Sequence, residues 1–337
     1  MKIFIIKLGA LGDVVRTLPL LPAIKEKYKD AEIDWVTKPN AVQVFEGNPF
    51  VKKVFTIPFK TQESPLRRAL LTQKYDILFN FDIEDEATAL ANEINAEVKY
   101  GFYSDTGYPA TFNIGAEYYL NTLFDDELKK TNEMTYQEMM FKSAEIEYKK
   151  QHCPIYLSDK DKRYAEEFIK KNKINTDKLI GVHIGGGGAR WPSKAWSEYK
   201  IKEFIERIKG KGYEVILFGG PDEIEKHSKL IDELKNKGIL VYYNNPHNSV
   251  KEFAALINIC QKIICSDTFA LHIALALKKP TAGLFFCTSP HEVEDYGLLR
   301  KIISPLLYNF FPEKQDQYSE ELVNSISVED VLNALRN

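Results

Sequence analysis

The sequence predicts an α/β protein built from two doubly wound, Rossmann-like domains. The chain has 337 residues and is 44% hydrophobic, which suits two domains of about 150 residues each. Short, almost entirely apolar runs, typical of strands covered on both faces of a parallel sheet, alternate with segments of helical spacing. This alternation begins at residue 2 and again near residue 179. We therefore expect domains over residues 1–172 and 173–337, with the last helix allowed to pack back on the first domain.

The first domain begins with an apolar strand over residues 2–7, followed by a glycine-containing turn up to residue 13. Helical spacing follows over 14–28, where Pro19 and Pro22 predict an irregular start. Residues 102–132 are rich in Gly, Tyr, Asn and Asp at their start and predict a long loop. The remaining expected elements are strands over 32–37, 51–57, 76–81, 97–100 and 154–157, and helices over 84–95, 134–148 and 159–173.

The second domain repeats the pattern, and its central unit is a strand, a turn, a helix and a strand over residues 262–286. Ser266 and Asp267 occupy the expected N-cap of that helix, and Pro280 follows its end. The other expected elements are strands over 179–184 and 214–218, and helices over 193–209, 250–259 and 328–335. Ligands of such folds bind at the carboxyl ends of the strands. We therefore expect Asp13 and the Asp267 turn on opposite walls of one cleft.

Composition excludes several classes of function. The formal net charge of −3 gives no global basic field for nucleic acid. The four cysteines form no CxxC pair, so their spacing indicates neither zinc nor a disulfide framework, and it suits a reducing cytoplasm. No apolar run reaches the roughly 18–20 residues that span a bilayer. We expect a cytoplasmic protein, and peripheral contact with the inner membrane stays open.

Asp13, in the turn after the first strand, is a candidate general base, because a carboxylate there can take a proton from an attacking hydroxyl. Capping of the following helix is the more ordinary role for this residue alone. Gly9 and Gly12 allow close backbone approach to a ligand. They do not form GxGxxG, and no acid ends the second strand, so a dinucleotide site is not favoured.

The glycine run after the strand at 179–184 is the first candidate for binding a donor. Gly185, Gly186 and Gly187 can form a nest of N–H groups around a diphosphate, although a flexible loop is the simpler interpretation. Arg190 and Lys194 follow closely and can neutralise phosphate charge.

Two further turns of the second domain carry acids. Asp222 and Glu223 follow a strand, where they can accept hydrogen bonds from ribose hydroxyls or cap a helix. Asp267, Thr268 and His272 lie at the start of an apolar helix. A helix N-terminus suits a phosphate, whereas the alternative is a capping aspartate with a core histidine.

The segment over residues 7–19, KLGALGDVVRTLP, resembles the opening motif of the lipopolysaccharide heptosyltransferases, glycosyltransferase family 9. The segments over 183–196, 219–223 and 267–297 are similar to three later motifs of that family, and the last includes Thr288 and Pro290. The four motifs occur in family order over nearly the whole chain. The resemblance implies the GT-B fold, in which two Rossmann-like domains face each other across a cleft.

The resemblance also implies the chemistry: an inverting, metal-independent transfer of a sugar, expected to be heptose from ADP-heptose, onto a lipopolysaccharide core or related glycan. Neither a cofactor nor a metal ion is expected. Asp13 would be the general base, and Arg190 would be the second catalytic residue. The expected donor-binding residues are Gly185, Gly186, Gly187, Lys194, Asp222, Glu223, Asp267, Thr268 and His272. Acceptor contacts are expected from Gly12, Arg16 and Asp82, and Lys60, Arg67 and Arg68 form either an anion-binding group or an exposed basic helix face.

The chain departs from the family pattern near the expected donor site. Ala189 stands where the family usually has lysine, Phe269 stands in place of a glycine, and Phe286-Cys287 replaces a Gly-Pro pair. These differences favour one alternative, a degenerate member that binds a nucleotide or glycan without transfer. A nucleotide-sugar epimerase, which shares the two-domain fold, is a third hypothesis.

Overall fold

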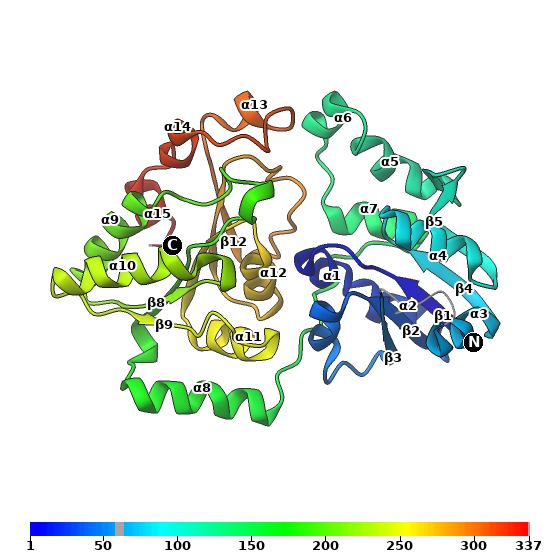
Figure 1. Ribbon diagram of the computed structural model, residues 1–337, viewed down its shortest axis with the longest axis horizontal. Coiled ribbons are helices and arrows are strands. Elements are labelled where there is room, and N and C mark those ends of the chain that lie inside the picture. The colour runs from blue at the N-terminus through cyan, green and yellow to red at the C-terminus, as the bar shows by residue number, and fades with distance from the viewer. Residues whose placement is uncertain (58–63, 336–337) are drawn as a thin grey trace. The chain divides into compact units, whose positions relative to one another are not determined.

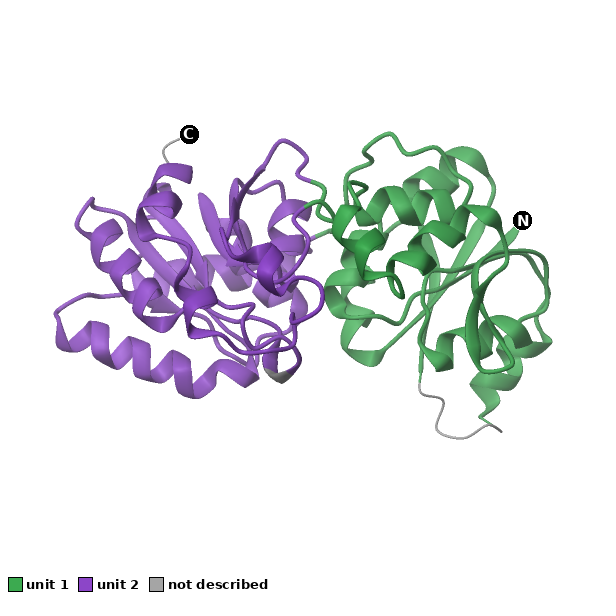
Figure 2. Cartoon of the chain, turned by 90° about the horizontal axis from the view of Figure 1, so that it is seen from above, with its two compact units in different colours: residues 1–156, 291–294 green, residues 157–290, 295–337 purple. Residues whose placement is uncertain are grey.

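The computed structural model describes residues 1–57 and 64–335, which form two compact units (Figures 1 and 2). Unit 1 comprises Met1–Tyr156 and His291–Glu294, and unit 2 comprises Leu157–Pro290 and Asp295–Asn337. Helix α8 (Asp159–Asn172), which the predicted boundary at 172 assigned to the first domain, belongs to unit 2. It packs on α11 (Val250–Ile259), and Asn248 Nδ2 donates to Tyr164 Oη at 2.6 Å.

Unit 1 contains a six-stranded sheet in the order β3-β2-β1-β4-β5-β6, parallel except at β6. The strands are β1 (Lys2–Ile6), β2 (Glu32–Thr37), β3 (Val51–Thr56), β4 (Tyr75–Asn80), β5 (Ala96–Asp105) and β6 (Tyr108–Thr111). The apolar residues of β1 are completely buried, as expected for a strand covered on both faces. The strand order reverses between β1 and β4, so the doubly wound topology places a ligand-binding edge after these two strands.

The first helix begins earlier than the sequence predicted. Helix α1 (Leu11–Thr17) starts three residues before the expected helix, and α2 (Leu20–Lys27) continues after a break at Leu18 and Pro19. The break agrees with the prolines, because a proline supplies no N–H to a continuous helix. Asp13 therefore lies inside the first turn, and the N-cap residue is Ala10, so Asp13 does not cap this helix.

The prediction of a long loop over 102–132 is wrong. Strand β5 continues to Asp105 and turns through Thr106 and Gly107 into β6. Both turn residues have positive φ, 49° and 92°, as tight hairpin turns require. The helices of unit 1 include α3 (Pro65–Thr72), α4 (Asp85–Glu93), α5 (Ile114–Thr122), α6 (Asp126–Thr131) and α7 (Tyr136–Ser143), and residues 154–157 do not form the expected strand.

Unit 2 also contains six strands, in the order β12-β11-β10-β7-β8-β9, and all its pairings are parallel. They are β7 (Leu179–His183), β8 (Glu214–Phe218), β9 (Tyr242–Tyr243), β10 (Lys262–Ser266), β11 (Thr281–Phe285) and β12 (Leu299–Ile303). Its other helices include α9 (Glu198–Lys209), α10 (Ile224–Asn236), α12 (Phe269–Ala276), α13 (Leu307–Phe310), α14 (Glu320–Asn324) and α15 (Val328–Ala334). The strand order reverses between β10 and β7, so the binding edge of this unit follows these two strands.

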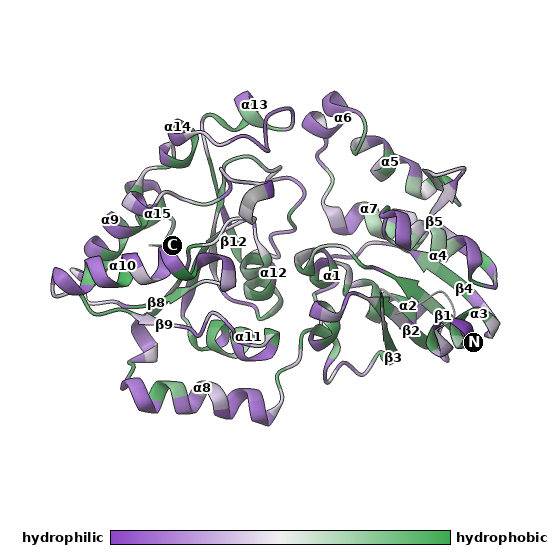
Figure 3. Ribbon diagram, in the orientation of Figure 1, coloured by the Kyte–Doolittle hydropathy of each residue, from purple (hydrophilic) through white to green (hydrophobic). Residues whose placement is uncertain are grey.

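Helix α12 is buried from Ala270 to its end at Ala276, and its apolar character is visible in Figure 3. The loop before α9 is held to the segment between α14 and α15, because the Trp196 indole N–H donates to the carbonyl of Ile326 at 3.2 Å. Helix α15 belongs to unit 2, where it packs on α9 and β12. Among the described residues, no helix is long and apolar enough to cross a membrane.

A buried ion pair joins the ends of β1 and β4. Lys7 Nζ lies 3.5 Å from Asp82 Oδ2, both side chains are 4% exposed, and the same ammonium donates to the carbonyl of Phe81 at 3.0 Å. Asp82 Oδ2 also accepts from the backbone N–H groups of Leu8 at 2.9 Å and Gly9 at 2.5 Å. Burial opposes both charges, but Lys7 and the backbone donors hold the pKa of Asp82 below its usual value, and Asp82 raises that of Lys7.

Four residues from late in the chain complete unit 1. The backbone N–H of Tyr136 donates to the carbonyl of Glu292 at 3.0 Å, and Val293 is buried. The Glu294 carboxylate is also buried and accepts from the hydroxyl of Tyr148 at 2.7 Å. The start of α7 is therefore fixed by a segment more than 150 residues further along the chain.

Replacing Asp82 with Asn is expected to lower the free energy of unfolding by about 3–5 kcal/mol at neutral pH, because it leaves the Lys7 charge buried without its partner. The folded-state pKa of Asp82 is depressed. Its stabilising contribution is thus complete above the unfolded-state value of about 4 and is lost as pH falls through the folded value. Denaturant unfolding of both proteins between pH 7 and pH 2 measures the difference, which should shrink at the acid end.

The control is Glu97→Gln, which breaks an exposed ion pair with Lys74 in the same sheet. This variant should unfold almost like the wild type at every pH. An Asp82→Asn protein as stable as this control would contradict the assigned role of the buried pair.

Candidate functional site

In unit 1, the predicted acid and arginine form an ion pair at the start of α1. Asp13 Oδ1 accepts from Arg16 Nε at 3.0 Å and lies 2.8 Å from Arg16 Nη2. The guanidinium carbon of Arg16 lies 3.9 Å from the ring centroid of Tyr136, at the start of α7. The Tyr136 hydroxyl is 3.2 Å from Thr17 Oγ1, which donates to the carbonyl of Asp13 at 2.7 Å. Arg16 is thus held by Asp13 on one side and by an aromatic ring on the other.

Asp13 is the more accessible member of the pair, with 31% of its side chain exposed against 15% for Arg16. Gly12 is the preceding residue in the same helical turn. Asp82, predicted as an acceptor contact, is instead buried in the ion pair with Lys7. It therefore fixes the turn that leads into α1, rather than presenting a free carboxylate. Arg67 is paired with Glu93, and Lys60 lies outside the described residues.

In unit 2, the glycine run leaves β7 at the reversal of strand order. Gly187 and Gly188 have φ of 83° and 60°, a conformation that glycine adopts without strain. Gly185 contacts Glu223 closely, since a Cβ added to Gly185 would lie 2.7 Å from Glu223 Oε1. Gly186 is in similarly close contact with Ala195. The run is therefore packed against its neighbours at its start and turns sharply at its end.

Lys194, Asp267 and His272 come together at the start of α12. Asp267 Oδ2 lies 3.4 Å from Lys194 Nζ, and Asp267 Oδ1 lies 3.6 Å from His272 Nε2. All three side chains are at most 15% exposed. The prediction that Ser266 and Asp267 supply the N-cap is wrong, because the N-cap residue is Thr268, one position later. The Asp267 carboxylate therefore lies in the charged cluster, one position before the N-cap residue.

Thr268 connects this cluster to β7. Its Oγ1 lies 3.5 Å from Nδ1 of His183. Burial, together with smaller contributions from nearby His227 and Lys226, lowers the pKa of His183 to about 4, against a raising contribution from the Gly185 backbone. The imidazole is therefore neutral at physiological pH, so the positive charge of this edge comes from lysine.

The remaining predicted donor residues are more exposed. Asp222 is exposed in the turn after β8, and Glu223 Oε2 accepts from the backbone N–H of Gly220 at 2.8 Å. Arg190 is exposed, and its guanidinium carbon lies 5.1 Å from the ring centroid of Trp191. Of the two predicted cations, Lys194 is therefore the one paired with Asp267. Arg190 lies near the Trp191 ring.

Several residues of these clusters were missed by reasoning from the sequence. Tyr136 has no motif signal, since it reaches Arg16 from a helix 120 residues away. Lys226 Nζ donates to the carbonyl of Ile184 at 3.3 Å. Its position three residues after Glu223, on the same helix face, is the sequence signal that could have identified it. Phe269, at the first position of α12, packs on Phe253 with ring centroids 5.6 Å apart.

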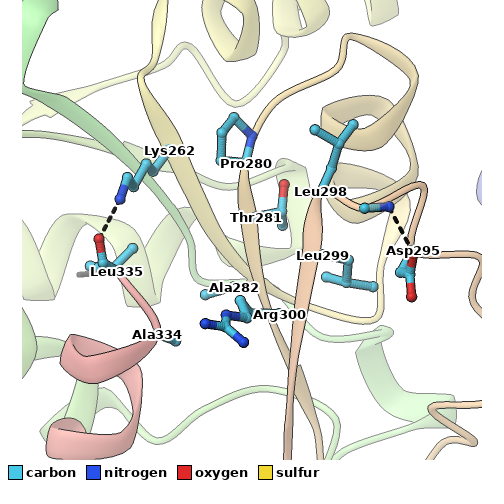
Figure 4. Close-up of a pocket in the computed structure, with 11 residues that line it drawn as sticks. Lys262, Pro280, Thr281, Ala282, Asp295, Leu298, Leu299, Arg300, Ala334 and Leu335 are labelled. Carbon is cyan, nitrogen blue, oxygen red and sulfur yellow. Dashed lines mark hydrogen bonds between the residues drawn. The ribbon is translucent and has the colours of Figure 1, made fainter. Parts of the chain in front are cut away.

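A pocket of about 460 Å³ lies at the opposite end of the unit 2 strands (Figure 4). It is lined by residues that begin β10, β11 and β12, among them Lys262, Thr281 and Arg300, and by Leu335. None of the predicted donor residues lines it. The predicted residues instead gather at the carboxyl edge of each sheet, as the topology requires.

Comparison with known proteins gives one consistent family. Residues 64–323 match the family model described as glycosyltransferase family 9 (heptosyltransferase). Lipopolysaccharide heptosyltransferase 1 of Campylobacter coli is 23% identical, with 100% of this chain and 98% of the relative covered. The corresponding enzyme of Salmonella typhimurium is 22% identical, with 88% and 92% covered.

Solved structures agree on the fold. A family 9 glycosyl transferase from Veillonella parvula superposes with a TM-score of 0.78 at 20% identity, covering 99% of this chain and 96% of its own. E. coli ADP-heptose lipopolysaccharide heptosyltransferase II gives a TM-score of 0.73 at 18% identity, covering 100% and 98%. These comparisons confirm the fold class and the family predicted from the motifs: the chain belongs to glycosyltransferase family 9, the heptosyltransferase family, and has its GT-B fold.

Proposed function

We propose that this glycosyltransferase moves heptose from ADP-heptose onto a sugar of the lipopolysaccharide core, with inversion and without a metal ion. The observation that carries the proposal is the pair of side-chain clusters at the carboxyl edges of the two sheets. One has an accessible carboxylate, Asp13, and the other has a lysine at a helix N-terminus, Lys194 beside α12. Sugar transfer needs a base for the acceptor and a charge sink for the leaving diphosphate.

On the acceptor side, Asp13 takes the proton of the attacking hydroxyl. That oxygen bonds to the anomeric carbon while the bond from this carbon to the diphosphate oxygen breaks, so ADP leaves with the electron pair. The Arg16 pair and the Tyr136 ring support this role, because they hold the carboxylate in one orientation. Gly12 and Arg16 are proposed to contact the acceptor.

On the donor side, the diphosphate binds near Lys194 and the start of α12, where an ammonium and the positive end of a helix favour anions. Gly185, Gly186 and Gly187 line its approach, and Asp267, Thr268 and His272 meet the diphosphate and sugar. Asp222 and Glu223 are proposed to meet the ribose. Arg190, exposed beside the glycine run, adds positive charge to the departing phosphate.

The relatives support this assignment of substrates. One structural relative, the E. coli heptosyltransferase WaaC, is described with ADP-2-deoxy-2-fluoro heptose and superposes with a TM-score of 0.65. The curated relatives act on lipopolysaccharide by name. Since such an acceptor is lipid-linked, we place the reaction in the cytoplasm, at the surface of the inner membrane.

One observation favours the alternative of a degenerate, non-transferring member. Phe269 puts a partly exposed aromatic ring directly after Thr268, where a donor group is expected. Its packing on Phe253 directs the ring toward α11, which reconciles it with a bound donor. Calorimetry with ADP, UDP and GDP, combined with a transfer assay, decides between the two: selective ADP binding with transfer supports the transferase, and nucleotide binding without transfer, or binding of none, supports the degenerate member.

ADP binding and sugar transfer are both expected to persist in excess EDTA, because Lys194 and the α12 N-terminus neutralise the diphosphate. The measurement is the ADP dissociation constant by calorimetry, with the transfer rate determined in parallel, with and without chelator. A loss of transfer that added Mg²⁺ or Mn²⁺ restores would overturn the metal-independent part of the proposal.

Replacing Asp13 with Asn is expected to lower kcat by a factor of about 10²–10⁴, since the amide cannot accept the acceptor proton. ADP affinity should stay unchanged, because the donor groups belong to unit 2. Steady-state transfer kinetics and calorimetry give the two values. As a matched control, Asp126→Asn changes an exposed first-turn acid on α6 and should transfer at the wild-type rate. Normal transfer by the Asp13 variant would show that the base lies elsewhere.

A further inference from the structure

The glycine run Gly185–Gly188, which follows β7 at the binding edge of unit 2, has to be held in shape by its surroundings. Glycine has more backbone freedom than any other residue, so a run of four glycines does not fix its own conformation. Exposure increases along the run, from the buried Gly185 to the exposed Gly187. The N–H groups of Gly185, Gly186 and Gly187 donate no hydrogen bond to any residue that the structure describes. The directions of these unused donors therefore depend on how the buried start of the run is held.

Two side chains from the start of α10 contact that buried start. Lys226 Nζ donates to the carbonyl of Ile184 at 3.3 Å. Glu223 lies against the next residue, since a Cβ added to Gly185 would be 2.7 Å from Glu223 Oε1. The peptide unit between Ile184 and Gly185 is planar and trans, so a hydrogen bond to its oxygen also fixes the direction of the Gly185 N–H.

The ammonium of Lys226 is not placed there for stability. Its side chain is partly buried and forms no ion pair with any described residue. Burial lowers its pKa, although the charges of Glu198 and Glu223 oppose the shift. A lysine pKa that is lower in the folded state means that the charged side chain lowers the free energy of unfolding at neutral pH. Attachment of α10 to α9 does not need Lys226, because Lys229 lies 3.3 Å from Glu198. A charge retained against stability is typical of a functional position.

We propose that Lys226 is a positioning residue for the nucleotide donor: its hydrogen bond to the Ile184 carbonyl holds the start of the glycine run in the conformation that receives the diphosphate. This inference rests on the proposed function, in which Gly185, Gly186 and Gly187 line the approach of the diphosphate. Without the lysine, the run becomes ordered only when the donor binds, and this loss of conformational freedom weakens binding. Lys226 acts through the backbone and does not itself contact the donor.

Lys226→Met is the direct test, since methionine keeps an unbranched side chain and removes the ammonium. Calorimetry should show ADP bound about tenfold more weakly. Adenosine, which lacks the diphosphate, should bind as it does to the wild type. The KM for the sugar donor should rise while kcat stays close to that of the wild type. Without nucleotide, the variant should unfold at the same temperature as the wild type or higher, because a partly buried charge has been removed.

A nuclear magnetic resonance signal reports on the proposed hydrogen bond itself. The ¹⁵N shift of an amide responds to the hydrogen bond of the preceding carbonyl, because both groups belong to one conjugated peptide unit. Labelling isoleucine carbonyls with ¹³C and glycine with ¹⁵N selects the three Ile–Gly pairs of the sequence, which end at Gly115, Gly181 and Gly185. In Lys226→Met without nucleotide, the Gly185 signal should move, whereas those of Gly115 and Gly181 should stay in place.

Two further variants complete the design. Lys226→Arg keeps a charged donor and should bind ADP within a few-fold of the wild type. Lys237→Met makes the same substitution at the other end of α10, where Lys237 Nζ lies 2.6 Å from Glu206 Oε1. This control should leave both the ADP affinity and the Gly185 signal unchanged.

Unchanged ADP affinity in Lys226→Met, with a wild type that binds ADP, would overturn the Lys226 assignment alone. Weaker ADP binding with an unmoved Gly185 signal would also overturn it, because the lysine would then contact the donor directly. Equal weakening of adenosine would contradict an action through the diphosphate. A wild type that binds no nucleoside diphosphate would overturn the proposed function as well.

Discussion

The acceptor edge of unit 1 depends on the buried ion pair between Lys7 and Asp82. The two charges come from neighbouring strands, and their contacts with backbone groups fix the path of the chain through Leu8 and Gly9 into α1. Two buried charges give little net stability unless all their hydrogen-bonding capacity is used. Here the ammonium reaches a carbonyl and the carboxylate reaches three backbone N–H groups, which makes one turn geometry strongly preferred.

The two sheet edges are organised in the same way but with different chemistry. In unit 1 the reversal of strand order presents a partly exposed carboxylate held by an arginine. In unit 2 the corresponding reversal presents a lysine held by a carboxylate, and His183, which burial keeps neutral, lies next to Thr268. A common topology thus supports a base in one unit and an anion site in the other, because the loops after the strands differ while the sheets do not.

The sequence predicted those parts of the fold that depend on local pattern. The strand over 214–218 and the helix over 250–259 have the predicted bounds, because apolar runs and a Ser-Val-Lys-Glu capping box define them locally. Asp267 and His272 could be grouped from the sequence because both lie in the short turn and first helical residues after one apolar strand. The pairing of Lys7 with Asp82 and the packing of Tyr136 on Arg16 join residues 75 and 120 positions apart, for which one sequence gives no local signal. The β5–β6 hairpin was missed because its aromatic alternation was outweighed by turn-forming residues.

The return of residues 291–294 to unit 1 bears on how the two halves of such proteins can be recombined. An amino-terminal half ending at residue 156 would lack the carbonyl that accepts from Tyr136 and the carboxylate that accepts from Tyr148. The ring that supports Arg16 would lose its backbone anchor at the same time. A chimaera that exchanges acceptor halves between family members therefore has to exchange residues 291–294 together with the amino-terminal half. Each half is compact in space, but unit 1 is encoded by two separate segments of the sequence.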